Sequence, residues 1–370
     1  MADLLTHVGP LSLRNPLVLA SGPLSHDGAA LVAAHRAGLA AAVTKTIRPE
    51  PARNPLPHIA AFPGSLLNSE RWSDLPAEQW IQREIPLAKD GEAVVIASVG
   101  ATAEDVRRLA GPLADAGADA LEVCSYEPHE AAPMVAAAVD ATSLPVFAKV
   151  SANWPDVVSV CADCLAAGAA GVTAIDSIGP ALRLDIDRRA PVLGDGAGWI
   201  SGAAILPLAL RVVADVSATL DANVIGTGGV SSANDVIEMM MAGAHAVGLC
   251  THLLIEGLDA VPRLLESLDA RLDALRVARV EDVVGAALPA LARAREHPHA
   301  PARTEARQWQ GPMIFVWSEP SCTGCHRCVR VCPYAARSAP DTVDSDRCRF
   351  CGLCVSACPT GALRLHNAMT

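Results

Sequence analysis

Short apolar strands alternate with longer amphipathic helices along most of this 370-residue chain. From about residue 17 to residue 277, each β-branched or alanine-rich run is followed by a run with helical periodicity. Eight such strand–helix units predict an α/β fold, a (β/α)₈ TIM barrel in place of an open doubly wound sheet. We expect strands at 17–20, 41–45, 94–99, 120–124, 146–150, 171–175, 223–226 and 246–249, and helices at 28–37, 77–89, 103–116, 131–140, 155–167, 203–220, 233–242 and 253–277.

Prolines and a change of composition separate this barrel from the C-terminal part of the chain. We expect the barrel to occupy residues 1–300, a linker to follow at 301–312, and a small domain to occupy 313–370. The Pro- and Asn-rich segment between Lys45 and Ala77 is expected at the C-terminal mouth of the barrel, where loops build active sites.

The small C-terminal domain carries eight of the twelve cysteines in two matching runs. Each run reads Cys-x-x-Cys-x-x-Cys-x-x-x-Cys-Pro, the spacing of bacterial ferredoxins with two [4Fe–4S] clusters. In that arrangement the fourth cysteine of each run binds the other cluster. We therefore expect one cluster on Cys322, Cys325, Cys328 and Cys358, and the other on Cys332, Cys348, Cys351 and Cys354. Structural zinc is the alternative for Cys-x-x-Cys pairs.

Charge and hydropathy exclude several classes of partner. The chain has 29 basic and 40 acidic residues, a net charge of −11, which argues against binding to nucleic acid. It shows no secretory signal and no apolar run of the ~20 residues needed to span a bilayer. We therefore expect a cytoplasmic protein without membrane contact, whose clustered cysteines bind metal. Cys161 and Cys164, one helical turn apart, are expected to be packing thiols.

Glycine-rich turns follow the last two predicted strands. Gly228 and Gly229 end the seventh strand, and Gly248 to Thr251 end the eighth, where backbone N–H groups bind phosphate in many barrels. Lys45 and Lys149 end two other strands, and a lysine in an apolar barrel mouth is costly to bury unless it meets an anion. The alternatives are glycines needed only for positive φ and lysines that reach solvent.

The order of these motifs resembles the class 1 dihydroorotate dehydrogenase family, whose barrel binds FMN. The resemblance rests on Asn15-Pro16 through Gly22, Thr44-Lys45-Thr46, Ala148-Lys149-Val150 and the glycine turns. With the two-cluster ferredoxin domain, the chain is most similar to the FMN and iron–sulfur subunit of bacterial dihydropyrimidine dehydrogenases. The resemblance implies FMN and two [4Fe–4S] clusters, with cofactor contacts from Ala20, Ser21, Gly22, Lys45, Thr46, Asn68, Lys149, Asp176, Ser201, Gly202, Gly228, Gly229, Cys250 and Thr251.

The substrate side departs from the family pattern. Where the family usually reads Glu-Leu-Asn-Leu-Ser-Cys-Pro-Asn, this chain reads Glu-Val-Cys-Ser-Tyr-Glu-Pro-His over residues 122–129. Glu127 then replaces the catalytic cysteine, while Cys124, His129 and Asp176 replace asparagines that hold a pyrimidine. Because paired amides recognise the imide edge of a pyrimidine, these changes predict the loss of ordinary orotate recognition. We also expect the loop that carries the family's lid to be shortened in this chain. The catalytic candidates are Tyr126, Glu127, His129 and Lys149.

These observations predict an iron–sulfur flavoprotein oxidoreductase that acts on a CH–CH group. We expect it to reduce a carbonyl-activated C=C bond, or to catalyse the reverse oxidation, with electrons relayed singly through the clusters. No Gly-x-Gly-x-x-Gly sequence follows a predicted strand, which implies an external NAD(P)H-oxidising flavoprotein subunit or a ferredoxin as electron partner. The other partners expected are a small-molecule substrate and further copies of the chain in a homo-oligomer. The alternatives are a dihydropyrimidine or dihydroorotate dehydrogenase with a rebuilt pocket, and a non-catalytic electron-transfer subunit.

Overall fold

The structure, a computed structural model, describes residues 2–296 and 313–367. The chain divides into two units, Met1–Glu296 and His297–Thr370. The expected linker at 301–312 lies outside the described residues, so the proposed domain boundaries stay predictions.

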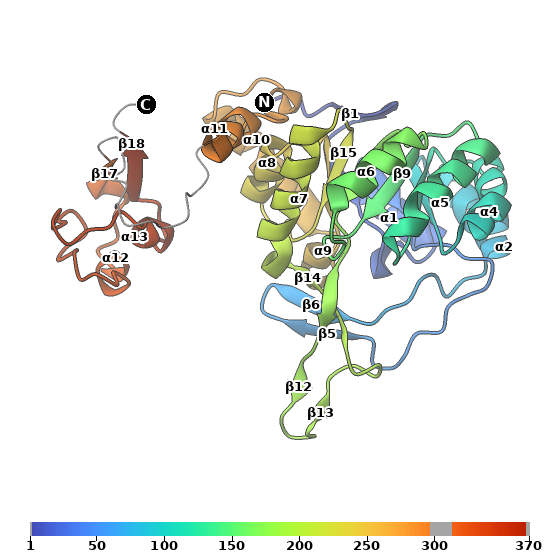
Figure 1. The fold of residues 1–370 in the computed structure, drawn as a ribbon, viewed down its shortest axis with the longest axis horizontal. Coiled ribbons are helices and arrows are strands. Elements are labelled where there is room, and N and C mark those ends of the chain that lie inside the picture. The colour runs from blue at the N-terminus through green and yellow to red at the C-terminus, as the bar shows by residue number, and fades with distance from the viewer. Residues whose placement is uncertain (1, 297–312, 368–370) are drawn as a thin grey trace. The chain divides into compact units, whose positions relative to one another are not determined.

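All eight expected strands are present, and they close into one parallel barrel, which confirms the predicted fold class (Figure 1). Around the barrel each strand pairs with the next in chain order, and the last of them pairs with the first. The barrel strands are β3 (Leu17–Leu19), β4 (Ala41–Val43), β7 (Val95–Val99), β8 (Ala120–Cys124), β9 (Val146–Val150), β10 (Gly171–Ala174), β15 (Val224–Thr227) and β16 (Ala246–Leu249).

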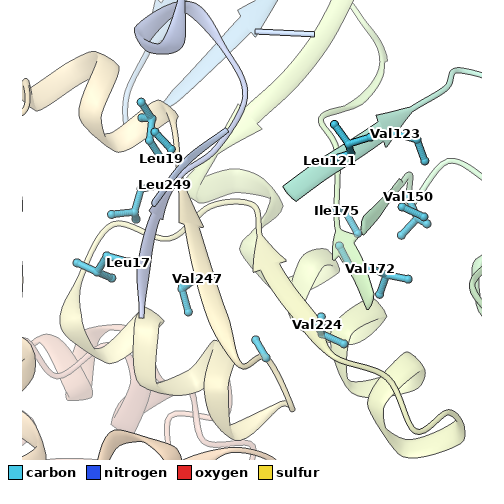
Figure 2. Close-up of a cluster of buried hydrophobic side chains, with 14 of the residues drawn as sticks. Leu17, Leu19, Leu121, Val123, Val150, Val172, Ile175, Val224, Val247 and Leu249 are labelled. Carbon is cyan, nitrogen blue, oxygen red and sulfur yellow. The ribbon is translucent and has the colours of Figure 1, made fainter. Parts of the chain in front are cut away.

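Successive residues of each strand face opposite sides of the sheet, which creates two separate buried layers. One layer packs beneath the helices, and Figure 2 shows ten of its side chains labelled, including Leu17 and Leu19 beside Val247 and Leu249. The other fills the barrel interior, where Phe147 packs in a cluster with Val18, Ile96 and Ile225. The hairpin of β1 (Thr6–Val8) and β2 (Leu11–Leu13) packs its buried apolar side chains into that inner cluster.

Toward the C-terminal ends of the strands the inward positions become polar. Lys149 pairs in register with Cys124 on one side and with Thr173 on the other, and Glu122 pairs with Ser98. All five are buried. The barrel therefore carries an apolar interior at one end and a charged interior at the other.

The helices follow the expected strand–helix alternation. Asp27, Thr102, Asp156 and Ser232 cap four of them, because each side chain accepts a hydrogen bond from a backbone N–H in the first turn. The barrel helices are α1 (Gly28–Ala37), α2 (Ala77–Gln79), α3 (Ile85–Asp90), α4 (Ala103–Asp115), α5 (Pro128–Ala141), α6 (Val157–Ala166), α7 (Leu206–Thr219), α8 (Ala233–Met241), α9 (Thr251–Glu256), α10 (Ala260–Ala274) and α11 (Leu288–Glu296).

One predicted helix is wrong in its extent. The segment expected as a single helix at 253–277 forms α9 and α10, with a break at Gly257. Gly257 has φ of +78°, a left-handed conformation that ends α9 and that helical periodicity alone does not reveal.

A second sheet covers the C-terminal mouth of the barrel, at the end opposite β1 (Figure 1). The segment between Lys45 and Ala77 reaches this mouth as expected. Part of it forms an antiparallel hairpin, and this hairpin pairs with a strand that follows β10 in the chain. Their register is fixed by main-chain pairing of Leu67 with Ala60 and with Ile200. The strands are β5 (Ile59–Phe62), β6 (Ser65–Asn68), β14 (Gly198–Gly202) and β11 (Ile178–Ala181), with a further small hairpin of β12 (Leu184–Asp185) and β13 (Ala190–Pro191).

The C-terminal unit contains an antiparallel pair of strands and two short helices. The strands β17 (Met313–Trp317) and β18 (Leu363–Asn367) enclose α12 (Arg327–Arg330) and α13 (Leu353–Ser356) in sequence. Each helix carries the third cysteine of its run, Cys328 or Cys354, and both cysteines are buried in one small apolar cluster. Within the described ranges, no helix has the length and apolar character to cross a membrane.

Candidate active site

A cavity of about 560 Å³ lies at the C-terminal ends of the barrel strands. Its volume lies within the usual range of small-molecule and cofactor sites. Segments that follow β3, β4, β8, β9, β10, β15 and β16 line it, and the sheet of β5, β6 and β14 supplies further wall residues. The barrel therefore gathers at one place side chains that are distant in the sequence.

The cofactor residues expected from the sequence all lie on the wall of this cavity. The set spans six strand ends and the covering sheet, as a ligand with both a ring system and a phosphate requires. Its members are Ala20, Ser21, Gly22, Lys45, Thr46, Asn68, Lys149, Asp176, Ser201, Gly202, Gly228, Gly229, Cys250 and Thr251.

Lys149 projects from β9 into the barrel mouth and is 9% exposed. Its Nζ lies 3.3 Å from Oδ1 of Asp176, whose other oxygen accepts from the Cys124 thiol at 3.9 Å. Burial, the largest single effect, would lower the pKa of Lys149, but Asp176, Cys124 and Glu122 together outweigh it and raise the pKa. The pKa of the Cys124 thiol rises to about 12 because of burial and of Asp176. The group therefore consists of a permanent cation beside a carboxylate and a neutral thiol.

Lys45 is the second buried cation of the cavity wall, and two carboxylates hold it. Its Nζ lies 2.9 Å from Oε1 of Glu70 and 3.3 Å from Oδ1 of Asp74. Burial opposes the effect, but the charge of Lys45 lowers the pKa of Asp74. The segment before α2 thus supplies the counter-charges for a strand-end lysine, which the sequence patterns do not reveal.

The turns after β15 and β16 fit a phosphate. Gly228 and Gly229 have φ of +123° and +84°, and a Cβ on Gly229 would lie 2.6 Å from the backbone N of Leu206. Thr251 donates a hydrogen bond to Ser201 Oγ at 2.8 Å, so two hydroxyl groups meet on the cavity wall. Thr227 Oγ1, in the same wall, is buried without a hydrogen-bond partner. Hydroxyl groups and a tight glycine backbone are suited to phosphate oxygens.

Aromatic rings form a wall at the other side of the cavity. Tyr126 stacks between Trp72, at 5.0 Å between ring centroids, and Trp199, at 6.1 Å. The Arg48 guanidinium lies 4.8 Å from the Trp72 ring, and Trp154 Nε1 donates to the Tyr126 carbonyl at 3.3 Å. All four of these rings line the cavity in a chain with only 3% aromatic residues. We call Trp72, Tyr126 and Trp199 the aromatic stack; sequence patterns missed its tryptophans because they lie outside the barrel strands.

The four catalytic candidates are not all brought together. Tyr126, Glu127 and Lys149 line the cavity, and the 125–127 loop is fixed by hydrogen bonds of Ser125 Oγ with the backbone of Glu127. The His129 side chain is 73% exposed, contacts Glu130, and does not line the cavity. The pKa of Tyr126 is raised by burial and by the neighbouring Cys124 and Asp176.

Glu122 is a buried charged residue that the sequence patterns do not single out. It is 1% exposed on the inward face of β8, and its Oε1 has no hydrogen-bond partner in the described structure. Burial raises its pKa, although Lys149 opposes this shift. The sequence signal for its inward position is that it lies two residues before Cys124, because alternate residues of a strand share one face.

The two thiols of α6 are packing residues, as expected. Cys161 and Cys164 are fully buried, and burial raises the pKa of each to about 12. At pH 8 only about one in 10⁴ of these groups is then a thiolate. We expect iodoacetamide at pH 8 to leave both unmodified in the native holoprotein and to label both after denaturation, as measured by peptide mass spectrometry. Native labelling at the denatured rate would contradict their burial.

The eight cysteines of the C-terminal unit line two separate hollows. Cys322, Cys325, Cys328 and Cys358 line one, which we call the first hollow. Cys332, Cys348, Cys351 and Cys354 line the other, the second hollow. Each hollow therefore receives three cysteines of one run and the fourth of the other run. This donor set of four thiols around a space fits a [4Fe–4S] cluster in each hollow.

Comparisons with known proteins agree with both units. The family "Dihydroorotate dehydrogenase" matches residues 3–272, and "4Fe-4S binding domain" matches 315–338 and 341–364. Similar proteins include the catalytic subunit of dihydroorotate dehydrogenase B (NAD(+)) from Methanothermobacter thermautotrophicus, 32% identical over 76% of this chain and 97% of the relative. The subunits of the same name from Pelobacter propionicus and Pyrococcus abyssi are 33% and 32% identical, over 77% and 75% of this chain and 98% and 97% of their own length.

The cofactors follow from these matches. The family binds FMN, and the two matched repeats correspond to two [4Fe–4S] clusters. The cavity and the two hollows provide residues that fit these groups. The chain belongs to the dihydroorotate dehydrogenase family, as a flavin-dependent oxidoreductase of CH–CH bonds with an iron–sulfur domain.

Proposed function

We propose that this chain reduces a carbonyl-activated C=C bond in a small molecule with a flat apolar part, and that the substrate is not orotate. The aromatic stack carries this proposal, because it walls the cavity beside Cys124 and Asp176, where amide side chains would recognise a pyrimidine. Stacked aromatic rings offer a large apolar surface to a conjugated substrate.

The residues of the cavity have separable roles in this proposal. FMN, when bound, supplies the hydride chemistry. Lys149 would supply a positive charge to the bound flavin, and Asp176 positions its ammonium group. Tyr126 supplies the proton, because its phenol is protonated at neutral pH and lines the cavity. The hydrogen-bonded 125–127 loop and the aromatic stack wall the cavity in place of a longer lid.

The electron partner is proposed to be an NAD(P)H-oxidising flavoprotein subunit, with a soluble ferredoxin as the alternative. The relatives are named as catalytic subunits of an NAD(+)-linked enzyme, which supports the first choice. The two clusters would accept electrons singly and pass them to FMN. Cytoplasmic location and a homo-oligomeric state stay predictions.

An anaerobic substrate screen tests the proposed function. The FMN- and cluster-loaded protein is reduced with dithionite and mixed with conjugated enones, enoates, cyclic imides and pyrimidines, and reoxidation of the flavin is followed by absorbance. We expect conjugated carbonyl compounds with an apolar ring to reoxidise the flavin faster than orotate or uracil. Reoxidation by the pyrimidines alone would contradict the proposal, and failure of every compound would favour an electron-transfer subunit.

The relatives favour one second candidate, oxidation of dihydroorotate with a rebuilt pocket. They are named for that activity and share about a third of their residues with this chain. Anaerobic mixing of the oxidised protein with dihydroorotate distinguishes the two candidates, since bleaching of the flavin would support this second one.

Substitutions at the 125–127 loop identify the proton donor. We expect Tyr126→Phe to lower kcat by about 10²-fold with little change in KM, because it keeps the aromatic stack but removes the phenol. Tyr126→Ala should also raise KM, because it opens the stack. The measurement is steady-state kinetics with the substrate found in the screen.

Glu127→Gln in parallel tests the second donor, with Glu130→Gln as its matched control outside the cavity. A large loss of kcat in Glu127→Gln, with none in Tyr126→Phe, would transfer the role to Glu127.

A further inference from the structure

The two hollows of the C-terminal unit are built from equivalent positions. The second cysteine run begins 26 residues after the first, since 348 − 322 = 26. The same offset relates the residues that follow each Cys-Pro turn, Ala336 to Ala362 and Arg337 to Leu363. Ala336 and Arg337 line the second hollow, and Ala362 and Leu363 line the first. The repeat therefore allows a position-by-position comparison of the two cluster environments.

The equivalent residues Arg337 and Leu363 differ in charge. Leu363 is 2% exposed and packs in the small apolar cluster with Cys328 and Cys354. Arg337 is 4% exposed, so a guanidinium is buried where the other half of the domain has an aliphatic side chain. Burial of a charge is unfavourable unless an opposite charge or hydrogen bonds compensate it.

The protein compensates this guanidinium only in part. Its Nη1 donates to the Pro340 carbonyl at 2.7 Å, and its Cζ lies 4.7 Å from the Phe315 ring centroid. Its Nε and Nη2 are buried and have no hydrogen-bond partner in the described structure. Among the described residues, no carboxylate forms an ion pair with it. Two nitrogen atoms, which carry three N–H groups, thus have no hydrogen-bond partner in the described structure on a residue that lines the second hollow.

The backbone does not distinguish the hollows in the same way. Backbone N–H groups at equivalent positions contact the fourth cysteine of each run: those of residues 334, 336 and 337 at Cys332, and those of residues 360, 362 and 363 at Cys358. In the second hollow this includes the Ala336 N–H, 3.3 Å from Cys332 Sγ. The two hollows therefore differ in the buried side chain at this equivalent position, which is Arg337 in the second hollow and Leu363 in the first.

We propose that Arg337 donates hydrogen bonds to the sulfur atoms of the cluster in the second hollow and raises its reduction potential above that of the cluster in the first hollow. A cluster gains negative charge on reduction, and a buried cation with free N–H donors stabilises that charge. The first hollow has Leu363 at the equivalent position, and no arginine is among the described residues that line it. The two clusters are then unequal one-electron carriers, and a single electron resides on the cluster held by Cys332, Cys348, Cys351 and Cys354.

A redox titration followed by electron paramagnetic resonance tests the proposal on the full chain with FMN and both clusters bound. We expect two separate one-electron cluster reductions in the wild type. In Arg337→Leu, which copies the first hollow, the higher potential should fall while the lower one stays. We expect at least a tenfold change in the ratio of oxidised to reduced second cluster at a fixed potential, which is about 59 mV for a one-electron couple.

Arg364→Leu is the matched control, because it removes the same charge from an exposed position next to Leu363. It should leave both potentials unchanged. Iron analysis, with about eight irons per chain, confirms loading. If Arg337→Leu does not bind full iron, Arg337→Gln serves instead, since its amide can still bond to the Pro340 carbonyl while the charge is lost. Coincident wild-type potentials, or an unchanged potential in a fully loaded Arg337 variant, would overturn the proposal.

Discussion

Replacement of Lys149 by methionine is expected to lower the rate of substrate-dependent flavin turnover by on the order of 10²-fold or more. Lys149 Nζ is a buried cation in the cavity wall, and methionine retains most of its length without its charge. Loss of a preorganised charge costs most where water is excluded, because bulk solvent does not replace it. The same variant should lower the midpoint potential of the bound FMN, since the negative charge of the reduced ring loses its counter-charge.

The measurement combines anaerobic kinetics with a spectroscopic redox titration of the flavin. Lys89→Met is the matched control, because Lys89 pairs with Asp119 at 2.6 Å and does not line the cavity. It should retain the wild-type flavin potential. An unchanged flavin potential in Lys149→Met, with FMN fully bound, would contradict the placement of Lys149 against the ring.

Substitution of Gly229 by alanine is expected to destabilise the barrel unit by about 3 kcal/mol and to weaken FMN binding by about tenfold or more. Gly229 has φ of +84°, and its Cβ would lie 2.6 Å from the backbone N of Leu206, at the start of α7. Since backbone must move to accommodate the methyl group, the turn after β15 loses the shape that fits a phosphate. Thermal unfolding and flavin content of the purified protein measure the two effects.

Gly257→Ala is the matched control, because it measures the free-energy cost of alanine at a positive φ without a steric clash. Gly257 has a similar φ of +78°, but a Cβ there meets nothing within 4 Å, and the residue is outside the cavity. The control should cost about 1–3 kcal/mol, because φ of 78° with ψ of 169° is a conformation that favours glycine, and should leave FMN binding unchanged. Equal destabilisation by the two substitutions, with full flavin content in both, would refute the close packing of the turn.

The barrel could be predicted from local sequence because each of its elements has a local signal. The eight strands are apolar runs, and glycines such as Gly117 and Gly168, both with positive φ, separate helices from the strands that follow. The break at Gly257 was missed because α9 and α10 share one apolar periodicity. The covering sheet was also missed, since β6 pairs with β14 more than 130 residues away, and no local sequence pattern indicates that pairing.

The convergence of the expected cofactor residues on one cavity could be predicted because most of them occupy strand ends. A barrel places all C-terminal strand ends around one mouth, so Lys45, Lys149 and Gly228 had to converge once the strands were assigned. No comparable rule places Trp72 and Trp199, because they lie outside the barrel strands. The inward position of Glu122 depends on strand alternation, but its unpaired Oε1 depends on neighbours from β7, β9 and β10.

By itself, the sequence determined the strand–helix alternation, the paired cysteine runs and the strand-end lysines and glycines, because these are encoded at short spacing. Only the tertiary structure decided which charges compensate one another, as with Lys45 and Glu70 or Lys149 and Asp176. It also decided which buried polar atoms lack a hydrogen-bond partner among the described residues, as with Nε and Nη2 of Arg337 beside the second hollow. Burial and electrostatic pairing depend on distances between residues far apart in the chain, and those distances exist only after folding.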